Sequence, residues 1–227
     1  MAEIYTKLLN ISLWAIAAVT FTACELDNYD EPSSMLTGKV VDGNGNPIGV
    51  QGSRGKVSLQ LWQPSYPLTA GAIDVYVGQD GTFSAKLFNG DYVLKLRDGN
   101  GPWEHTGEEL AIHVGGNTAV TFPVKPYYTL SNVTYSLSGT TLSATFTITE
   151  ATAKGIDKVF LLVNSTQFVD EEDQVKREEG NAVVGTQTVT IDLSGDWDKH
   201  KFLYARVGLR INGVEHGLYD TQVEKIK

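Results

Sequence analysis

The sequence predicts an all-β protein with two consecutive antiparallel β-sandwich domains, which follow a signal segment and an acidic tether. Runs in which every second residue is apolar recur along the chain, and Val57, Leu59 and Leu61 form one of them. Turn sequences rich in Gly, Asn and Asp separate these runs, a combination typical of antiparallel sandwiches. No stretch shows a convincing helical period, so we expect strands and turns.

The first sandwich is predicted over residues 35–124. Its clearest alternating runs lie at 57–62, 73–77, 82–87 and 110–114. Turn sequences lie at 42–47, 78–81, 89–91 and 115–117. Gly and Asn in these turns tolerate the positive φ that tight hairpins need.

The second sandwich is predicted over residues 127–227. Two prolines at 123 and 126 mark the boundary, because proline cannot donate to a central strand ladder. Alternating runs then follow at 133–137, 142–148, 156–164, 186–193, 201–211 and 217–226. This number of strands suits an immunoglobulin or fibronectin-like sandwich of about 100 residues. Residues 165–185 are expected to form a long loop, with at most one helical turn at 176–180.

The first 23 residues predict a secretory signal. Lys7 precedes an apolar run at 8–21, which is shorter than the roughly 20 residues that span a bilayer. The small residues before Cys24 resemble the bacterial lipobox, and this resemblance implies that Cys24 is lipidated and becomes the mature N-terminus. Residues 24–34 are acidic and lack periodicity, so we expect a tether between lipid and fold.

Composition limits the candidate partners. The formal net charge of −9 argues against nucleic acid, whose affinity rests on Lys and Arg neutralising phosphates. The same charge gives no attraction to anionic lipid head groups, so membrane contact is expected through the acyl chains alone. Cys24 is the single cysteine, which excludes an internal disulfide.

No motif in the chain predicts a metal, a cofactor or a catalytic centre. The segment 42–47 (DGNGNP) begins like a calcium loop, but Pro47 and Ser53 stand where that loop needs Gly and Glu, so a turn is favoured. The four acidic residues at 170–173 are either a solvated acidic loop or, if they fold back on it, a site for a hard cation. The four histidines lack zinc-ligand spacing, and nucleophile-elbow and phosphate-loop motifs are absent. We therefore expect a protein that is not an enzyme.

Aromatic residues outside the apolar stripes are the candidate binding residues. The alternation at 57–62 leaves Trp62 on the polar face, and Tyr76 is out of phase with its apolar neighbours. Tyr66 and Trp103 lie in loops. Solvent-facing rings stack on the apolar faces of sugars, and such contacts contribute about 0.5–1.5 kcal/mol beyond area burial. We take these four as candidate glycan-binding residues. The alternative is that Trp62 and Tyr76 cover the second sheet or the domain interface and Trp103 closes its own loop.

Residues 35–124 resemble the transthyretin-like, carboxypeptidase-regulatory-like sandwich. The resemblance rests on four segments: 36–42 (LTGKVVD), 45–48 (GNPI), 81–83 (GTF) and 90–94 (GDYVL). The whole chain resembles a two-domain family of Bacteroidetes-type surface lipoproteins of unknown function, in which an acidic stretch such as 27–30 (DNYD) follows the lipidated cysteine. This resemblance implies an outer-membrane lipoprotein that faces the cell exterior and belongs to a polysaccharide-utilisation locus.

Three hypotheses for function follow from these observations. The first is a non-catalytic, lipid-anchored surface module that helps bind glycans for a polysaccharide-uptake system. The second is a structural spacer or a protein-interaction subunit of an outer-membrane transport complex. The third is a hydrolase with an unrecognised site.

Overall fold

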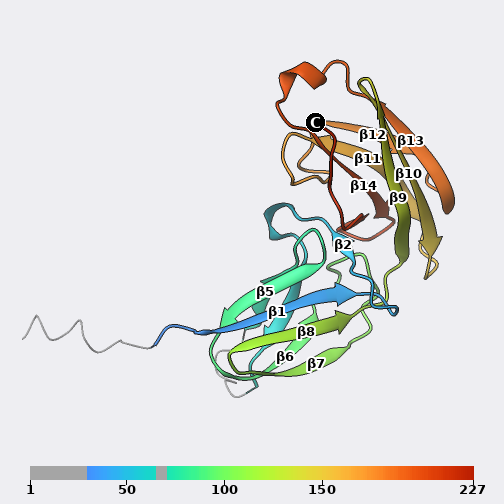
Figure 1. The fold of residues 1–227 in the computed structure, drawn as a ribbon. Coiled ribbons are helices and arrows are strands. Elements are labelled where there is room, and N and C mark those ends of the chain that lie inside the picture. Colours follow the sequence, from blue (N-terminus) through green and yellow to red (C-terminus); the bar gives the residue numbers. More distant parts are fainter. Residues whose placement is uncertain (1–29, 65–70) are drawn as a thin grey trace, which may run out of the picture. The chain divides into compact units, whose positions relative to one another are not determined.

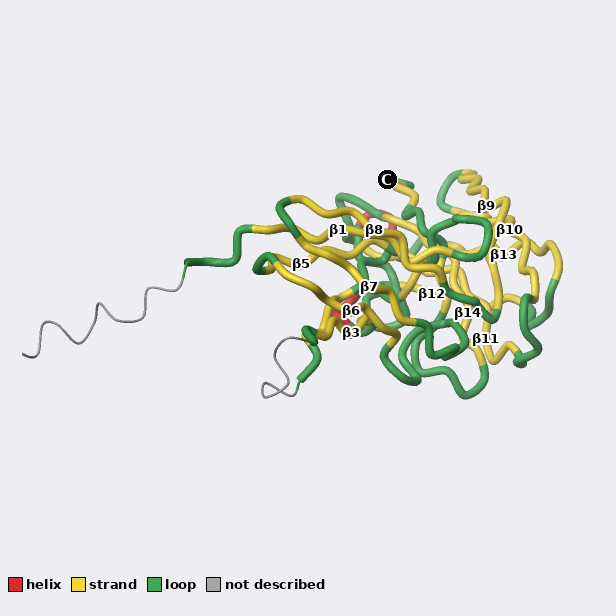
Figure 2. The backbone as a smooth tube through the Cα atoms, turned by 90° about the horizontal axis from the view of Figure 1, so that it is seen from below, coloured by secondary structure: helices red, strands yellow, loops and turns green. Residues whose placement is uncertain are grey.

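The computed structural model describes residues 30–64 and 71–227. Nearly every element in these residues is a strand, and the exceptions are short 3₁₀ turns at Ser53–Gly55 and Trp197–Lys199 (Figure 2). The predicted all-β class is confirmed. No helix in the described part of the chain is long and apolar enough to cross a membrane. The predicted lipidation site Cys24 and the candidate Tyr66 lie outside the described residues.

The N-terminal sandwich consists of two sheets with the strand orders β5-β1-β8 and β4-β3-β6-β7 (Figure 1). Their bounds are β1 Ser34–Val41, β3 Ser58–Trp62, β4 Ile73–Tyr76, β5 Thr82–Leu87, β6 Gly90–Leu96, β7 Glu109–Val114 and β8 Asn117–Pro123. Leu36, Leu59 and Leu94 are completely buried in the core between the sheets. Burying such a side chain contributes about 1.5–3 kcal/mol, so the inward halves of these alternating runs stabilise the fold.

One strand pair departs from the predicted antiparallel pattern. β1 pairs with β8 in parallel, from Met35↔Asn117 to Val41↔Pro123. The other strand pairs among the described residues are antiparallel. Alternation of apolar residues determines which face is buried but not the direction of the neighbouring strand, so the sequence pattern could not reveal this pair.

The C-terminal sandwich has the sheets β13-β10-β9 and β12-β11-β14-β15-β2, with β16 also paired to β14. Their bounds are β2 Gly49–Val50, β9 Tyr128–Ser138, β10 Thr141–Glu150, β11 Ile156–Asn164, β12 Lys176–Gly180, β13 Gly185–Asp192, β14 Tyr204–Ile211, β15 Leu218–Tyr219 and β16 Glu224–Lys225. The prediction of one long loop over 165–185, with at most one helical turn at 176–180, is wrong at 176–180, because these residues form the edge strand β12 along β11. Charged residues are common on edge strands, where they oppose aggregation, and they hide the apolar alternation.

A short strand of the N-terminal sandwich completes a sheet of the C-terminal one. In β2, Val50 pairs with Leu218 and Gly49 pairs with Tyr219. Residues Ser33–Lys227 accordingly form one compact unit.

The segment 42–47 is a turn, as predicted. The Asp42 carboxylate accepts the backbone N–H groups of Asn44 and Asn46, both at 2.9 Å. Backbone bonds between Asp42 and Asn46 and from Gly45 to Asp42 close the loop. Its carboxylate is therefore engaged by the backbone of its own turn, which is the usual role of Asp at such positions.

Candidate functional site

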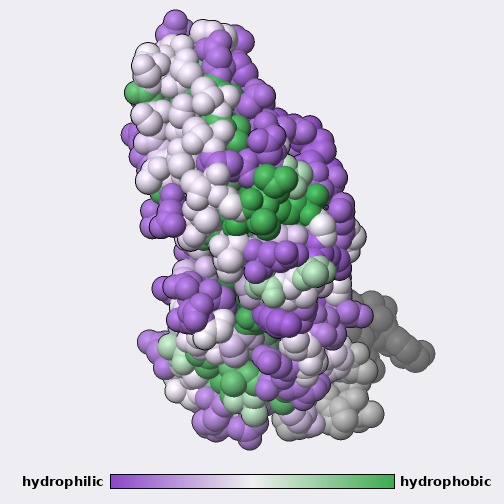
Figure 3. All heavy atoms as spheres, turned by 90° about the vertical axis from the view of Figure 1, so that its right-hand side faces the viewer, coloured by the Kyte–Doolittle hydropathy of each residue, from purple (hydrophilic) through white to green (hydrophobic). Residues whose placement is uncertain are grey.

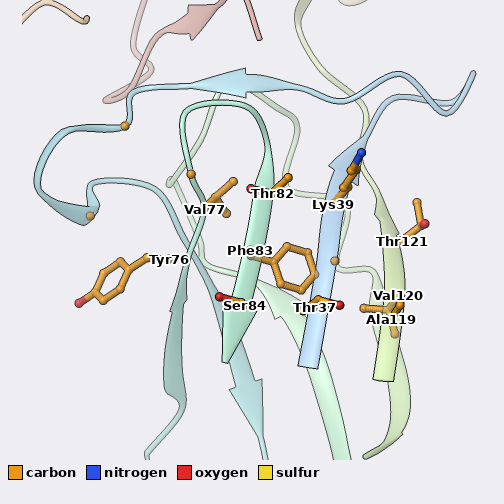
Figure 4. Close-up of a pocket in the computed structure, with 14 residues that line it drawn as sticks. Thr37, Lys39, Tyr76, Val77, Thr82, Phe83, Ser84, Ala119, Val120 and Thr121 are labelled. Carbon is orange, nitrogen blue, oxygen red and sulfur yellow. The ribbon is translucent and has the colours of Figure 1, made fainter. Parts of the chain in front are cut away.

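An open groove of about 1090 Å³ lies over the solvent-facing side of the sheet β5-β1-β8 (Figure 4). Its floor comes from β1, β5 and β8, and Tyr76 at the end of β4 lies at its edge, with the ring directed away from these strands (Figure 4). Hollows of this kind with a few placed polar groups are the usual sites of ligand binding, so the groove is the candidate functional site.

The strand register explains which side chains face the groove. Ser84 lies opposite Thr37, and Thr37 lies opposite Ala119. The next row along the strands is formed by Thr82, Lys39 and Thr121. Side chains alternate between the faces of a strand, so the apolar residues between these rows enter the core and the short hydroxyl side chains face the groove.

Tyr76 extends the first row across the sheet edge. An isolated bridge pairs Val77 with Phe83, and both residues are buried. Their neighbours Tyr76 and Ser84 therefore lie on the opposite, solvent side. Tyr76 is 56% exposed, as its out-of-phase position predicts.

The Tyr76 ring is held against the backbone at Gly55. An added Cβ at Gly55 would lie 2.9 Å from Tyr76 Cδ1, and Gly55 has a φ of +59°. Glycine is therefore required here for both conformation and space. This packing restrains one side of the ring and leaves the rest free to contact a ligand.

Charges of both signs border the groove. Lys39 lies on its floor, and no described residue forms an ion pair with it. Asp80 accepts hydrogen bonds from Thr82 N at 3.1 Å and Thr82 Oγ1 at 2.7 Å. Burial acts to raise the pKa of Asp80, but these bonds and the charge of Lys39 outweigh it, so the pKa lies below its ordinary value of 3.8. Asp80 is therefore an acceptor at neutral pH.

Trp62 is exposed but does not line the groove. It is 38% exposed at the end of β3, opposite Val93 of β6. Its ring lies on the outer face of the other sheet of the N-terminal sandwich. Of the predicted aromatic residues that the structure describes, Tyr76 alone lines the groove.

The structure corrects the prediction that Trp103 faces solvent. Its side chain is only 4% exposed and belongs to the apolar core, and its backbone bridges to Pro126. Gly101, with a φ of +108°, turns the chain so that the ring lies against it; an added Cβ there would be 2.3 Å from the indole. A buried ring offers no face to a sugar, so Trp103 leaves the candidate site. The alternative that it closes its own loop describes it better.

Within the acidic run at 170–173, the carboxylate of Asp170 binds backbone N–H groups. Asp170 is buried, and its Oδ2 accepts the backbone N–H of Ser53 at 2.9 Å. Its Oδ1 accepts the N–H groups of Glu172 and Asp173. In residues 30–64 and 71–227, no three His, Cys, Asp or Glu side chains group as a metal site. The loop instead joins the second sandwich to the first.

Two residues near the groove were not predicted from the sequence. Phe168 is 59% exposed in the loop after β11, where the acidic run at 170–173 dominates the pattern. Arg206 is completely buried in β14 and donates hydrogen bonds to the carbonyl oxygens of Gln79, Val169 and Asp220. A charged residue inside an apolar run was the available signal for Arg206, because such a residue needs buried partners.

Family models match both halves of the chain. The N-terminal domain of a protein of unknown function, DUF3823, matches residues 34–125, and the domain DUF3823_C matches residues 128–225. The chain belongs to the DUF3823 family. A comparison with curated proteins found no match.

Solved structures of DUF3823 proteins share this fold. One from Parabacteroides merdae is 39% identical, with a TM-score of 0.80 over 87% of this chain and 100% of that one. One from Bacteroides ovatus is 31% identical, with a TM-score of 0.75 over 85% and 97%. A structure from Bacteroides uniformis, described as a proposed carbohydrate-binding protein, is 18% identical, with a TM-score of 0.70 over 86% and 99%. At that identity the third likeness shows the fold alone.

Proposed function

We propose that this DUF3823 protein is a non-catalytic module that binds glycans at the groove over β5-β1-β8. The observation that carries the proposal is the exposed Tyr76 ring, restrained against Gly55 beside a floor of short hydroxyl side chains. An aromatic face beside hydrogen-bonding groups matches a sugar ring, which has apolar faces and a hydroxyl edge.

The polar groups of the groove suit sugar hydroxyls. Ser84 and Thr121 donate and accept hydrogen bonds and Lys39 donates them. The ionised Asp80, on the turn that borders the groove, accepts them. The description of the Bacteroides uniformis structure as a proposed carbohydrate-binding protein supports the same class of ligand.

The proposal includes the anchor predicted from the sequence. Lipidation at Cys24 would hold the module on the outer membrane, facing the cell exterior, where it helps a polysaccharide-uptake system capture its substrate. Each buried acyl methylene contributes about 0.8 kcal/mol, so two or more chains hold a protein stably.

A second candidate function is a spacer or interaction subunit of an outer-membrane transport complex. The pairing of β2 with β15 and the buried Arg206 favour it, because they join the sandwiches firmly. Cross-linking to a transporter in intact membranes, without any retention on glycans, is the result expected of this alternative.

The test is a binding screen of the full chain in detergent against starch, xylan, mannan, arabinan and mixed-linkage β-glucan. Where a polysaccharide binds, we expect Tyr76→Ala to weaken binding about tenfold, which is the upper range of an aromatic contact. Binding is measured by retention in affinity gels and by calorimetry.

The matched control is Phe88→Ala. Phe88 is also an exposed aromatic residue, at 48%, and it lines none of the hollows described here. Equal losses for Tyr76→Ala and Phe88→Ala, or no loss for either, would contradict a site at the groove.

A further inference from the structure

A second hollow meets the groove at the border between the sandwiches. It has a volume of about 730 Å³ and shares Gly78 with the groove. One side is the turn 78–81 between β4 and β5, and the other is formed by Phe168, Tyr204 and Lys225 of the C-terminal sandwich. We call it the junction hollow.

Phe168 is an exposed ring in the junction hollow, and its backbone is held in place. Asn164 Nδ2 donates a hydrogen bond to the Phe168 carbonyl oxygen at 2.6 Å. Gln79 Nε2 donates to the neighbouring Gln167 carbonyl oxygen at 3.0 Å. These bonds fix the loop that carries the ring to both sandwiches, as an aromatic platform requires.

Arg206 fixes the distance between the two sides of the junction hollow. Its guanidinium donates to Gln79 O at 2.5 Å, on the turn, and to Val169 O at 3.3 Å, next to Phe168. The same group lies 4.8 Å from the centre of the Tyr219 ring. Because Arg206 is completely buried, water does not compete for these bonds.

We propose that the groove and the junction hollow form one track for an extended, neutral polysaccharide chain, with stacking platforms at Tyr76 and Phe168. The inference rests on the proposed function and specifies its substrate class. Single aromatic contacts are weak, and a ligand that reaches both platforms gains from both, so the track favours polymers over short sugars.

The charges along the track favour a neutral chain. Lys39, Asp80 and Lys225 line it with both signs, so no polymer of one sign is matched along its length. The net charge of −9 repels acidic polymers from the protein as a whole.

The experiment compares ligands by length. Calorimetry on the full chain in detergent measures the dissociation constants of disaccharides, trisaccharides and long oligosaccharides made from whichever screened polysaccharide binds, with polygalacturonate as the acidic probe. We expect Phe168→Ala to weaken the binding of long ligands about two- to tenfold. The same substitution should leave unchanged the affinity for short ligands, which Tyr76→Ala weakens. Phe88→Ala is the control, and circular dichroism verifies that each variant is folded.

The outcomes separate this inference from the proposed function. Two results would contradict the continuous track but not glycan binding at the groove. In both, Tyr76→Ala weakens binding, while Phe168→Ala has either no effect or the same effect on short and long ligands. If Tyr76→Ala has no effect on any ligand, or no polysaccharide binds, both proposals are overturned. Tighter binding of polygalacturonate than of any neutral polysaccharide overturns the assignment to a neutral chain.

Discussion

The two sandwiches each present a sheet face rich in Ser and Thr, but their hydroxyl groups have different partners. On the C-terminal sandwich, the hydroxyls of β10 and β13 pair across the strands: Ser143 with Thr190, Thr145 with Thr188 and Thr147 with Thr186, at 2.8–2.9 Å. Figure 3 shows the broad pale surface of intermediate hydropathy on this side of the molecule. We call it the hydroxyl face.

The groove floor differs because some of its hydroxyl groups have no hydrogen-bond partner among the described residues. Ser84 and Thr121 form no side-chain hydrogen bond to any described residue, although both face the groove. Cross-strand Thr pairs stabilise a sheet by about 0.2–1 kcal/mol each. The comparison teaches that the same residue type stabilises the fold where hydroxyls pair with one another and is available to a ligand where they do not.

The largest expected effect is on the free energy of unfolding, and it tests whether the two sandwiches form one folding unit. Arg206→Met leaves the carbonyl oxygens of Gln79, Val169 and Asp220 without their donor, so we expect a loss of about 2–4 kcal/mol in the free energy of unfolding. Burial lowers the pKa of Arg206 to about 10, so the side chain is still a cation at neutral pH. Urea unfolding, followed by tryptophan fluorescence, measures the change.

Arg210→Met is the matched control for Arg206. Arg210 lies on the same strand and pairs with Asp157 at 2.5 Å and with Glu171 at 3.4 Å. Exposed ion pairs contribute about 0–1 kcal/mol, so a small loss is expected. Equal losses for the two arginines would mean that the sandwiches are not joined through Arg206.

An intermediate effect separates the two hydroxyl-rich faces directly. We expect Thr121→Val to weaken glycan binding about two- to tenfold, the value of one neutral hydrogen bond, without loss of stability. Thr145→Val should reduce stability by about 0.5 kcal/mol, because it removes one cross-strand pair, and leave binding unchanged. Calorimetry with the bound glycan and thermal unfolding measure the two quantities. A loss of stability in Thr121→Val together with a loss of glycan binding in Thr145→Val would contradict the comparison.

The smallest expected effect concerns pH. The pKa of Asp80 lies below 3.8, so its charge is present at neutral pH and glycan affinity should be unchanged down to about pH 5. The stability that this ionised carboxylate contributes is present above its unfolded pKa and is lost only as the pH falls through the lowered, folded pKa. Asp80→Asn removes the titration. A loss of affinity above pH 5 in the wild type, but not in Asp80→Asn, would contradict the assigned shift.

Strands with a clear alternation were predictable from the sequence. The run at 82–87 matches β5, because period two follows directly from one face being buried. The run at 156–164 matches β11, where the residues from Val159 onward are buried on both faces and a continuous apolar run is the signal. The exposure of Tyr76 followed from the same rule. β12 and β2 were missed because their signal is not local: β12 is an edge strand of charged residues, and β2 has two residues whose partner lies at 218–219.

The candidate site was predictable only in part, for the same reason. Tyr76 could be selected by its phase within a strand, whereas Trp103 lies in a loop, where no alternation indicates burial. Phe168 lines a hollow together with residues 78–80, which are far away in the sequence. Sites assembled by packing between sandwiches depend on contacts that sequence spacing does not encode.

Because of strand β2, the two sandwiches cannot be exchanged separately by recombination or by protein engineering. Cutting the chain between residues 123 and 128 would remove β2 from the end of the sheet that contains β15, and would expose an unpaired strand edge. Such edges recruit other chains and promote aggregation. The cut would also take away the Gln79 oxygen that Arg206 binds. A recombination event or a fusion design that exchanges one half of the protein must therefore carry the residues at 49–50 and 79 along with the C-terminal half.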